Sequence, residues 1–226
     1  AAETRWDWSR RHPVIRISFG GGVVSSEAGL VQRIQHGLRG NFRALGLARA
    51  DDIPFDDVAG HLADLIERAH AASGQQAVVL VDEYDKPILD NITEPATARL
   101  MREGLRNLYS VLKEMDAHLK FVFLTGVSKF SKVSLFSGLN NLHDITLDAR
   151  WSALCGYTDA DLDTVFAPEL PGLDRDEIRR WYNGYNWLGV GVYNPFDVLL
   201  LFDSRQFKAH WFDTGTPTFL VRLLAE

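Results

Sequence analysis

Two groups of polar side chains directly follow runs of apolar residues, and both contain residue types that can hold a metal ion or a phosphate. Asp82 and Glu83 follow the apolar run 77–81, and Thr125 stands at the end of the run 121–125. A carboxylate fixed by a rigid strand can bind Mg²⁺, and a carboxylate beside it can orient or deprotonate a water molecule. The pattern therefore favours a site for a nucleoside triphosphate and its metal. Solvated carboxylates at a strand end are the alternative.

The segment after the second apolar run adds further candidates. Thr125 is placed to contact the γ-phosphate and the attacking water of such a ligand, with Ser128 as a second candidate. Lys129 and Lys132 can meet phosphate oxygens as point charges. For each lysine taken alone, a solvated basic turn is the alternative.

These candidates need a scaffold that brings two strand ends together, and the hydrophobic pattern predicts one. Strands are expected at 13–19, 77–81 and 121–125, and helices separate them. The order strand, helices, strand, helix, strand is typical of an α/β fold with an open, mostly parallel sheet. Ligands of such sheets bind beyond the carboxyl ends of the strands. The run 77–81 has no polar residue, so we expect it to be buried on both faces.

The sequence pattern changes after Asp148. The expected helices are shorter there, and aromatic-rich segments connect them. We predict an α/β core over residues 1–150 and a helical, lid-like C-terminal subdomain over residues 151–226. The helices expected in this subdomain are 159–166, 174–182, 195–202 and 217–224.

The composition of the 226 residues is that of a globular protein, with a net charge of −6 that argues against binding nucleic acid through general basicity. The single cysteine, Cys155, excludes an internal disulfide framework and suits a reducing compartment.

No apolar run approaches the roughly 18 residues of a membrane span. We therefore expect a soluble cytoplasmic protein without a membrane partner.

Five ordered segments of the chain resemble the bacterial AAA-ATPase-like family, whose ATPase domain often occurs with a PD-(D/E)XK nuclease-like domain. The segment 79–90 resembles the Walker B region of that family, and the other matching segments are 121–142, 181–185, 193–196 and 211–217. The resemblance implies a P-loop NTPase fold with a helical C-terminal part, ATP and Mg²⁺ as ligands, and ATP hydrolysis as the activity.

The same resemblance carries roles onto individual positions. It implies that Asp82 is the metal ligand, Glu83 the catalytic carboxylate and Thr125 the sensor of the γ-phosphate. In related ATPases a Gly-x-Pro element near the C-terminal lid lies close to the nucleotide base. Gly215 and Pro217 stand in the corresponding place here.

The chain departs from the family at one motif, because no G-x-x-x-x-G-K-[ST] sequence occurs in it and Gly20–Gly21–Gly22 is followed by no lysine. Either the phosphate-binding segment is missing from this chain, or the chain is a degenerate relative that serves as a scaffold for protein interaction. The strand that leads into that loop is usually central in the sheet. We therefore expect an exposed hydrophobic groove at the sheet edge, or self-association through it.

Two other classes of function compete with an ATPase. A non-catalytic pseudo-ATPase scaffold or interaction module would need the fold but no turnover. A metal-dependent nuclease would gather Asp82, Glu83 and Asp85 around Mg²⁺ with Lys86 nearby. Contact with nucleic acid, or with a nuclease-like domain, is expected through a separate domain. No G-x-S-x-G motif is present, which argues against a serine hydrolase.

Overall fold

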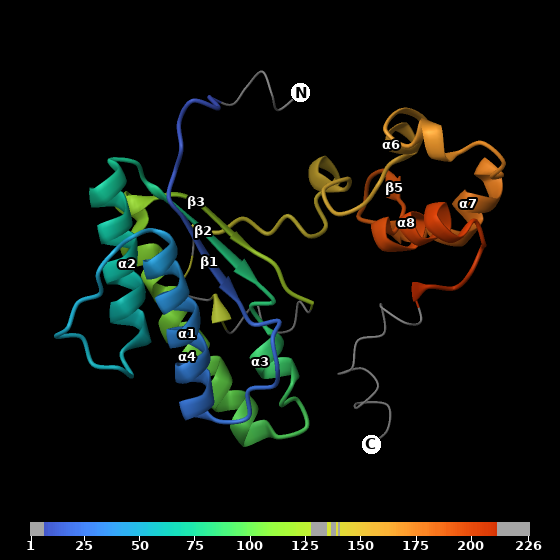
Figure 1. Cartoon of the computed structure of the whole chain (residues 1–226). Coiled ribbons are helices and arrows are strands. Elements are labelled where there is room, and N and C mark those ends of the chain that lie inside the picture. Colours follow the sequence, from blue (N-terminus) through green and yellow to red (C-terminus); the bar gives the residue numbers. More distant parts are fainter. Residues whose placement is uncertain (1–6, 128–134, 137–138, 140, 212–226) are drawn as a thin grey trace. The chain divides into compact units, whose positions relative to one another are not determined.

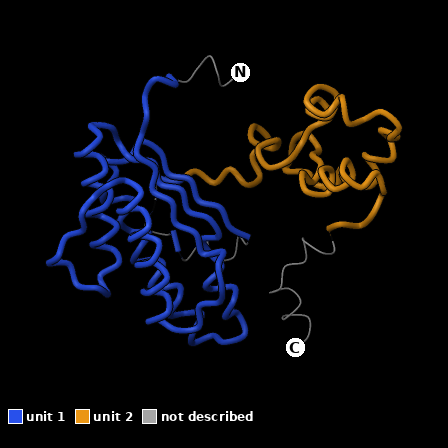
Figure 2. Tube along the Cα trace, viewed as in Figure 1, with its two compact units in different colours: residues 1–142 blue, residues 143–226 orange. Residues whose placement is uncertain are grey.

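The computed structural model describes residues 7–127, 135–136, 139 and 141–211. The chain divides into two units, residues 1–142 and residues 143–226 (Figure 2). The domain boundary predicted between residues 150 and 151 falls within the second of these units.

Unit 1 is built on a three-stranded sheet whose order is β1 (Val14–Ser18), β2 (Ala77–Asp82) and β3 (Leu119–Leu124) (Figure 1). Both pairs of strands are parallel. The predicted strands and the parallel α/β class are thus confirmed. Because Ser18 pairs with Asp82 and Val81 pairs with Leu124, the three carboxyl ends meet at one edge of the sheet.

The first two helices of unit 1 begin at side chains that accept hydrogen bonds from the first turn. The Ser26 hydroxyl accepts from Gly29 N at 3.1 Å, and the Asp57 carboxylate accepts from Gly60 N at 2.8 Å. No helix in the described ranges is both long and apolar enough to cross a lipid bilayer. The helices of this unit are α1 (Glu27–Ala44), α2 (Val58–Ser73), α3 (Lys86–Leu89), α4 (Pro95–Glu114) and η1 (Asp116–His118).

Only one face of the sheet is fully covered in the described part of unit 1. Figure 1 shows α1, α2 and α4 on one side of it, where Ile15, Ile17, Val79 and Val81 are buried. On the other face, Val78 and Leu80 are half-buried and pair with Phe121 and Phe123. The Phe121 side chain is 54% exposed. The prediction that the run 77–81 is buried on both faces is therefore wrong, because the described helices pack on one face alone.

The two edges of this sheet differ. On β1, the Asn41 side chain accepts from Arg16 N at 2.8 Å and donates to Arg16 O at 2.7 Å, which closes the outer edge of that strand. Among the described residues no side chain makes such a contact with β3. An unprotected edge strand can pair with another strand. Self-association through this edge remains a prediction.

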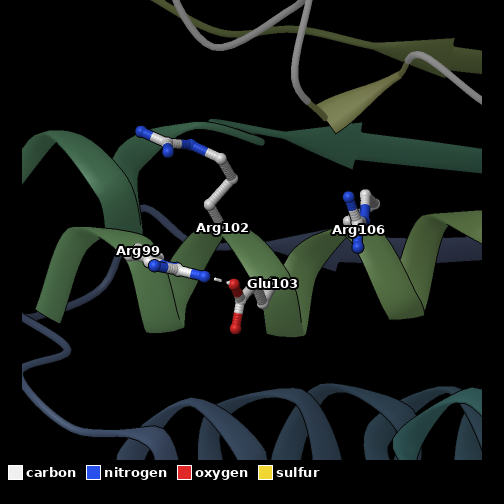
Figure 3. Close-up of a pocket in the computed structure, with 4 residues that line it drawn as sticks. All are labelled: Arg99, Arg102, Glu103 and Arg106. Carbon is white, nitrogen blue, oxygen red and sulfur yellow. Dashed lines mark hydrogen bonds and ion pairs between the residues drawn. The ribbon is translucent and has the colours of Figure 1, made fainter. Parts of the chain in front are cut away.

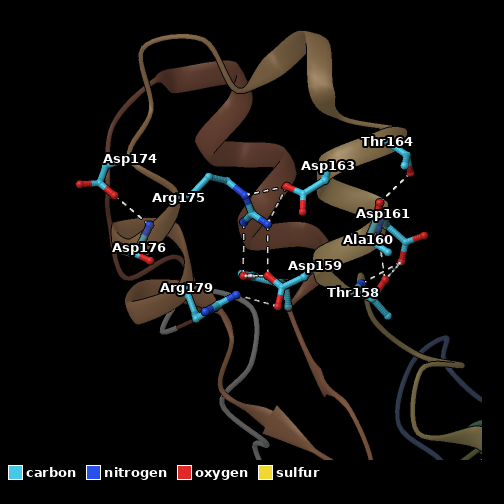
Figure 4. A network of polar contacts seen from close by, with 11 residues as sticks. Thr158, Asp159, Ala160, Asp161, Asp163, Thr164, Asp174, Arg175, Asp176 and Arg179 are labelled. Atoms are coloured by element: carbon cyan, nitrogen blue, oxygen red, sulfur yellow. Dashed lines mark hydrogen bonds and ion pairs between the residues drawn. The ribbon is translucent and has the colours of Figure 1, made fainter.

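Unit 2 packs three short helices and a two-stranded antiparallel sheet around Leu162, Ile178 and Tyr193. A polar network joins α6 to α7, since Arg175 and Arg179 both contact the Asp159 carboxylate, at 3.1 and 2.9 Å (Figure 4). Three of the four predicted helices are confirmed, and the one at 217–224 lies outside the described residues. The elements are η2 (Ala149–Trp151), α6 (Asp159–Thr164), η3 (Ala167–Glu169), α7 (Arg175–Tyr182), β4 (Tyr185–Asn186), β5 (Gly191–Val192) and α8 (Pro195–Ser204).

Candidate functional site

The structure brings Asp82 and Thr125 together at the carboxyl edge of the sheet. Asp82 is the last residue of β2, and Thr125 follows the last residue of β3. The Thr125 hydroxyl donates to Asp82 Oδ1 at 2.8 Å, and the Asp82 side chain is exposed. Asp82 Oδ2 has no hydrogen-bond partner among the described residues. One oxygen of the carboxylate is therefore oriented by the protein, and the other is available to a ligand.

Backbone hydrogen bonds continue past the ends of β2 and β3 and fix this contact. Thr125 N donates to Val81 O at 2.8 Å, and Tyr84 N donates to Thr125 O at 2.9 Å. Gly126 packs so closely against this turn that a Cβ there would collide with the ring of Tyr84. A side chain at position 126 would thus push the two strand ends apart.

Asp85 braces the same two segments from inside the protein. Its side chain is completely buried, and its Oδ1 accepts a hydrogen bond from Val127 N at 3.1 Å. The Tyr109 hydroxyl, on α4, donates to Tyr84 O at 3.1 Å. Burial, assisted by the Asp85 carboxylate, raises the pKa of Tyr109, which keeps the hydroxyl a neutral donor. The turn after β2 is therefore held by both β3 and α4.

Glu83 has a strained backbone at the centre of this turn. Its φ of 53° lies in the left-handed region, which residues with a side chain rarely adopt. Its carboxyl group lies beside Gly20, where a Cβ would stand 3.5 Å from the carboxyl carbon. The carboxylate accepts no hydrogen bond in the described part of the chain. Such strain often occurs at functional positions, and here it turns an unpaired carboxylate toward the loop that follows β1.

The glycine loop after β1 is tied to the same region by Lys86. Its Nζ donates to Gly22 O at 3.0 Å and pairs with the Asp90 carboxylate at 2.5 Å. The guanidinium group of Arg33 lies so close to this loop that a Cβ on Gly21 or Gly22 would stand 2.9 or 3.0 Å from one of its nitrogens, closer than ordinary van der Waals contact. The ends of all three strands are therefore connected by side-chain contacts.

The other predicted site residues lie outside the described residues. These are Ser128, Lys129, Gly215 and Pro217.

The nuclease arrangement is not supported by the geometry. Asp85 is buried and occupied by Val127 N, so it does not share a solvent-facing site with Asp82. In the ranges that the structure describes, no three side chains of His, Cys, Asp or Glu form a group that could hold a metal.

Sequence reasoning missed Asp85 as a bracing residue. The segment Asp82-Glu83-Tyr84-Asp85 has the pattern of solvated carboxylates after a strand. Nothing in the spacing of these residues indicates that Asp85 is buried while Asp82 is exposed. The nearest available signal is the apolar segment that follows, Pro87-Ile88-Leu89, which is buried in the short helix α3.

Comparisons with known proteins agree with the family resemblance. A family model described as "Predicted AAA-ATPase", AAA-ATPase_like, matches residues 1–136. A curated relative from Azotobacter chroococcum mcd 1, named "Uncharacterized protein in vnfD 5'region", is 65% identical over 222 residues. That match covers 98% of this chain and 42% of the relative, so the chain spans about two fifths of the relative's length. No solved structure matches.

Proposed function

We propose that this chain, which belongs to the AAA-ATPase-like family, forms part of a site that hydrolyses ATP. That part binds the metal and senses the γ-phosphate. The observation that carries the proposal is the hydrogen bond from Thr125 to Asp82 at the carboxyl edge of the sheet. In open α/β folds this edge is where ligands bind. We also propose that the fold is of the P-loop NTPase type.

The side chains at this edge fit a magnesium ion. The second carboxylate oxygen of Asp82 is a hard oxygen ligand, and no other described residue uses it. Mg²⁺ is usually bound by one or two protein carboxylates together with substrate phosphates and water. A magnesium site of this kind does not need the larger group of acidic side chains that is absent from the described residues.

Each residue has a separate task in the proposed reaction. Asp82 holds the metal through the oxygen that Thr125 does not occupy. Glu83 orients a water molecule and accepts its proton, which an unpaired carboxylate can do. Thr125 keeps Asp82 in one orientation and would sense the terminal phosphate. When bound, Mg²⁺ neutralises charge on the β- and γ-phosphates.

Further contacts to the phosphates are needed, because residues 1–226 contain no G-x-x-x-x-G-K-[ST] motif. We propose that Ser128 and Lys129 supply part of them, that Gly215 and Pro217 lie near the base, and that a phosphate-binding loop comes from residues outside this chain. In such a loop the glycine-rich backbone supplies amide groups that bind the phosphates, and the lysine supplies positive charge.

The proposal is tested by ATP hydrolysis in the full-length protein. Glu83→Gln keeps the size of the side chain but cannot accept the proton, so turnover should fall by about 10² or more while ATP binding persists. Glu67→Gln is the matched control, because Glu67 is exposed on α2 and makes no contact among the described residues. Equal turnover in both variants, or no Mg²⁺-dependent hydrolysis in the wild type, would refute the proposal.

A further inference from the structure

A stripe of arginines on α4 stands apart from the strand-end site. Arg99, Arg102 and Arg106 follow one another at spacings of three and four residues, which places them on one side of a helix. Together with Glu103 they line a surface pocket of about 400 Å³ (Figure 3).

The charge in this pocket is poorly compensated. Glu103 pairs with Arg99 at 2.9 Å, but Arg102 and Arg106 make no ion pair in the part of the chain that the structure describes. The Nε atom of Arg102 is buried and has no hydrogen-bond partner among those residues. A buried donor without an acceptor is costly. Three guanidinium groups against one carboxylate thus give a local excess of positive charge on a chain whose net charge is −6.

We propose that Arg99, Arg102 and Arg106 bind successive phosphate groups of an extended ligand. Guanidinium groups match phosphate oxygens with two parallel hydrogen bonds, which makes arginine well suited to this ligand. In Figure 3 the three guanidinium groups do not converge on one point. Residues 99 and 106 are about 10 Å apart along the helix axis, from the rise of 1.5 Å per residue. This geometry favours several phosphates in a row over a single compact anion.

Two sources supply that chemistry, the backbone of a nucleic-acid strand and a polyphosphate chain such as that of a nucleotide. The inference does not depend on the proposed ATPase function, because its residues come from α4 and from neither strand end.

Fluorescence anisotropy with a short labelled oligothymidylate, in EDTA and at several salt concentrations, tests the proposal on the full-length protein. The double variant Arg102→Gln/Arg106→Gln should bind about tenfold or more weakly, since hydrogen bonds to charged groups are lost. The slope of log K against log salt should fall by about 0.7 for each lost phosphate contact on a single strand. Arg43→Gln is the matched control, an exposed helical arginine of α1 with no ion pair among the described residues.

Competition by inorganic tripolyphosphate and by polyglutamate separates the outcomes. If tripolyphosphate binds and the oligonucleotide does not, with the same loss in the double variant, the site is supported and its ligand is a polyphosphate chain. Equal competition by polyglutamate would overturn the preference for phosphate. The site itself would be overturned if the double variant bound these ligands as tightly as the wild type, or if a wild type whose circular dichroism shows it folded bound neither the oligonucleotide nor tripolyphosphate.

Discussion

The Thr125 hydroxyl donates a hydrogen bond to Asp82 Oδ1 at 2.8 Å, although the two residues are 43 positions apart in the sequence. The contact exists because β2 and β3 are adjacent parallel strands that end at the same edge of the sheet. It holds the carboxylate through Oδ1 and leaves Oδ2, which has no partner among the described residues, available to a ligand. The proposed chemistry therefore depends on the relative position of two strand ends.

Replacement of Thr125 by valine removes this hydrogen bond without changing the shape of the side chain. We predict that ATP turnover falls by about 10², the effect expected when one oriented donor is lost from an active site, while nucleotide affinity changes little. Thr125→Ser keeps the hydroxyl and should retain most of the activity. Steady-state kinetics of both variants provide the measurement, and equal loss in the serine and valine variants would contradict the assigned role of the hydroxyl.

Replacement of Glu83 by glycine should stabilise the fold while it abolishes turnover. The left-handed backbone of Glu83 costs about 1 to 2 kcal/mol for a residue with a side chain, and glycine adopts it freely. Part of that gain is lost to the greater entropy of glycine in the unfolded chain, so we expect a net gain of about 1 kcal/mol. Chemical denaturation measures the change, with Glu83→Gln as the control that keeps the strain. A less stable glycine variant would show that the backbone is not strained.

Loss of the buried Asp85 carboxylate should loosen the segment that carries Thr125. In Asp85→Ala the partly buried amide of Val127 loses its acceptor, which costs about 1 kcal/mol. Asp85→Asn keeps an oxygen acceptor at the same place and should be milder. Hydrogen exchange of the peptide covering residues 121–127 reports the effect directly. If alanine and asparagine variants exchange at the wild-type rate, Asp85 does not brace this segment.

The apolar face around Phe121 should promote self-association. Phe121 is 54% exposed, and its ring stacks on that of Phe123 with centroids 6.1 Å apart. A lysine on an edge strand opposes pairing with another strand, so Phe121→Lys should shift the protein toward monomer in sedimentation velocity. Leu100→Lys, at an exposed position on α4, is the control for added charge. A wild type that is monomeric and does not bind an apolar dye such as ANS would contradict this prediction.

The sequence predicts the strands and the long helices of unit 1 well because each of them has a strong local signal. The run 77–81 reads as a buried strand, and Ser26 and Asp57 mark the first turns of α1 and α2 by their ability to cap them. The juxtaposition of Asp82 and Thr125 also follows, since parallel strands place their carboxyl ends together.

Two features could not be predicted, because they depend on contacts between distant residues. A strand with a continuous apolar sequence can have one face covered or both. The sequence therefore does not indicate that Val78 and Leu80 are only half-buried. The burial of Asp85 is likewise set by Val127, 42 positions away, and by the packing of α3 and α4 beneath the turn.

Equilibrium binding of a fluorescent ATP analogue, with and without Mg²⁺, tests the central claim most directly. The full-length wild type should bind the analogue in a Mg²⁺-dependent manner, and Asp82→Asn should lose that dependence. Asp203→Asn, an exposed aspartate on α8 with no contact among the described residues, should behave as the wild type. Binding with the same Mg²⁺ dependence in both variants, or no binding at all at millimolar nucleotide, would contradict the assignment of this edge of the sheet as a nucleotide site.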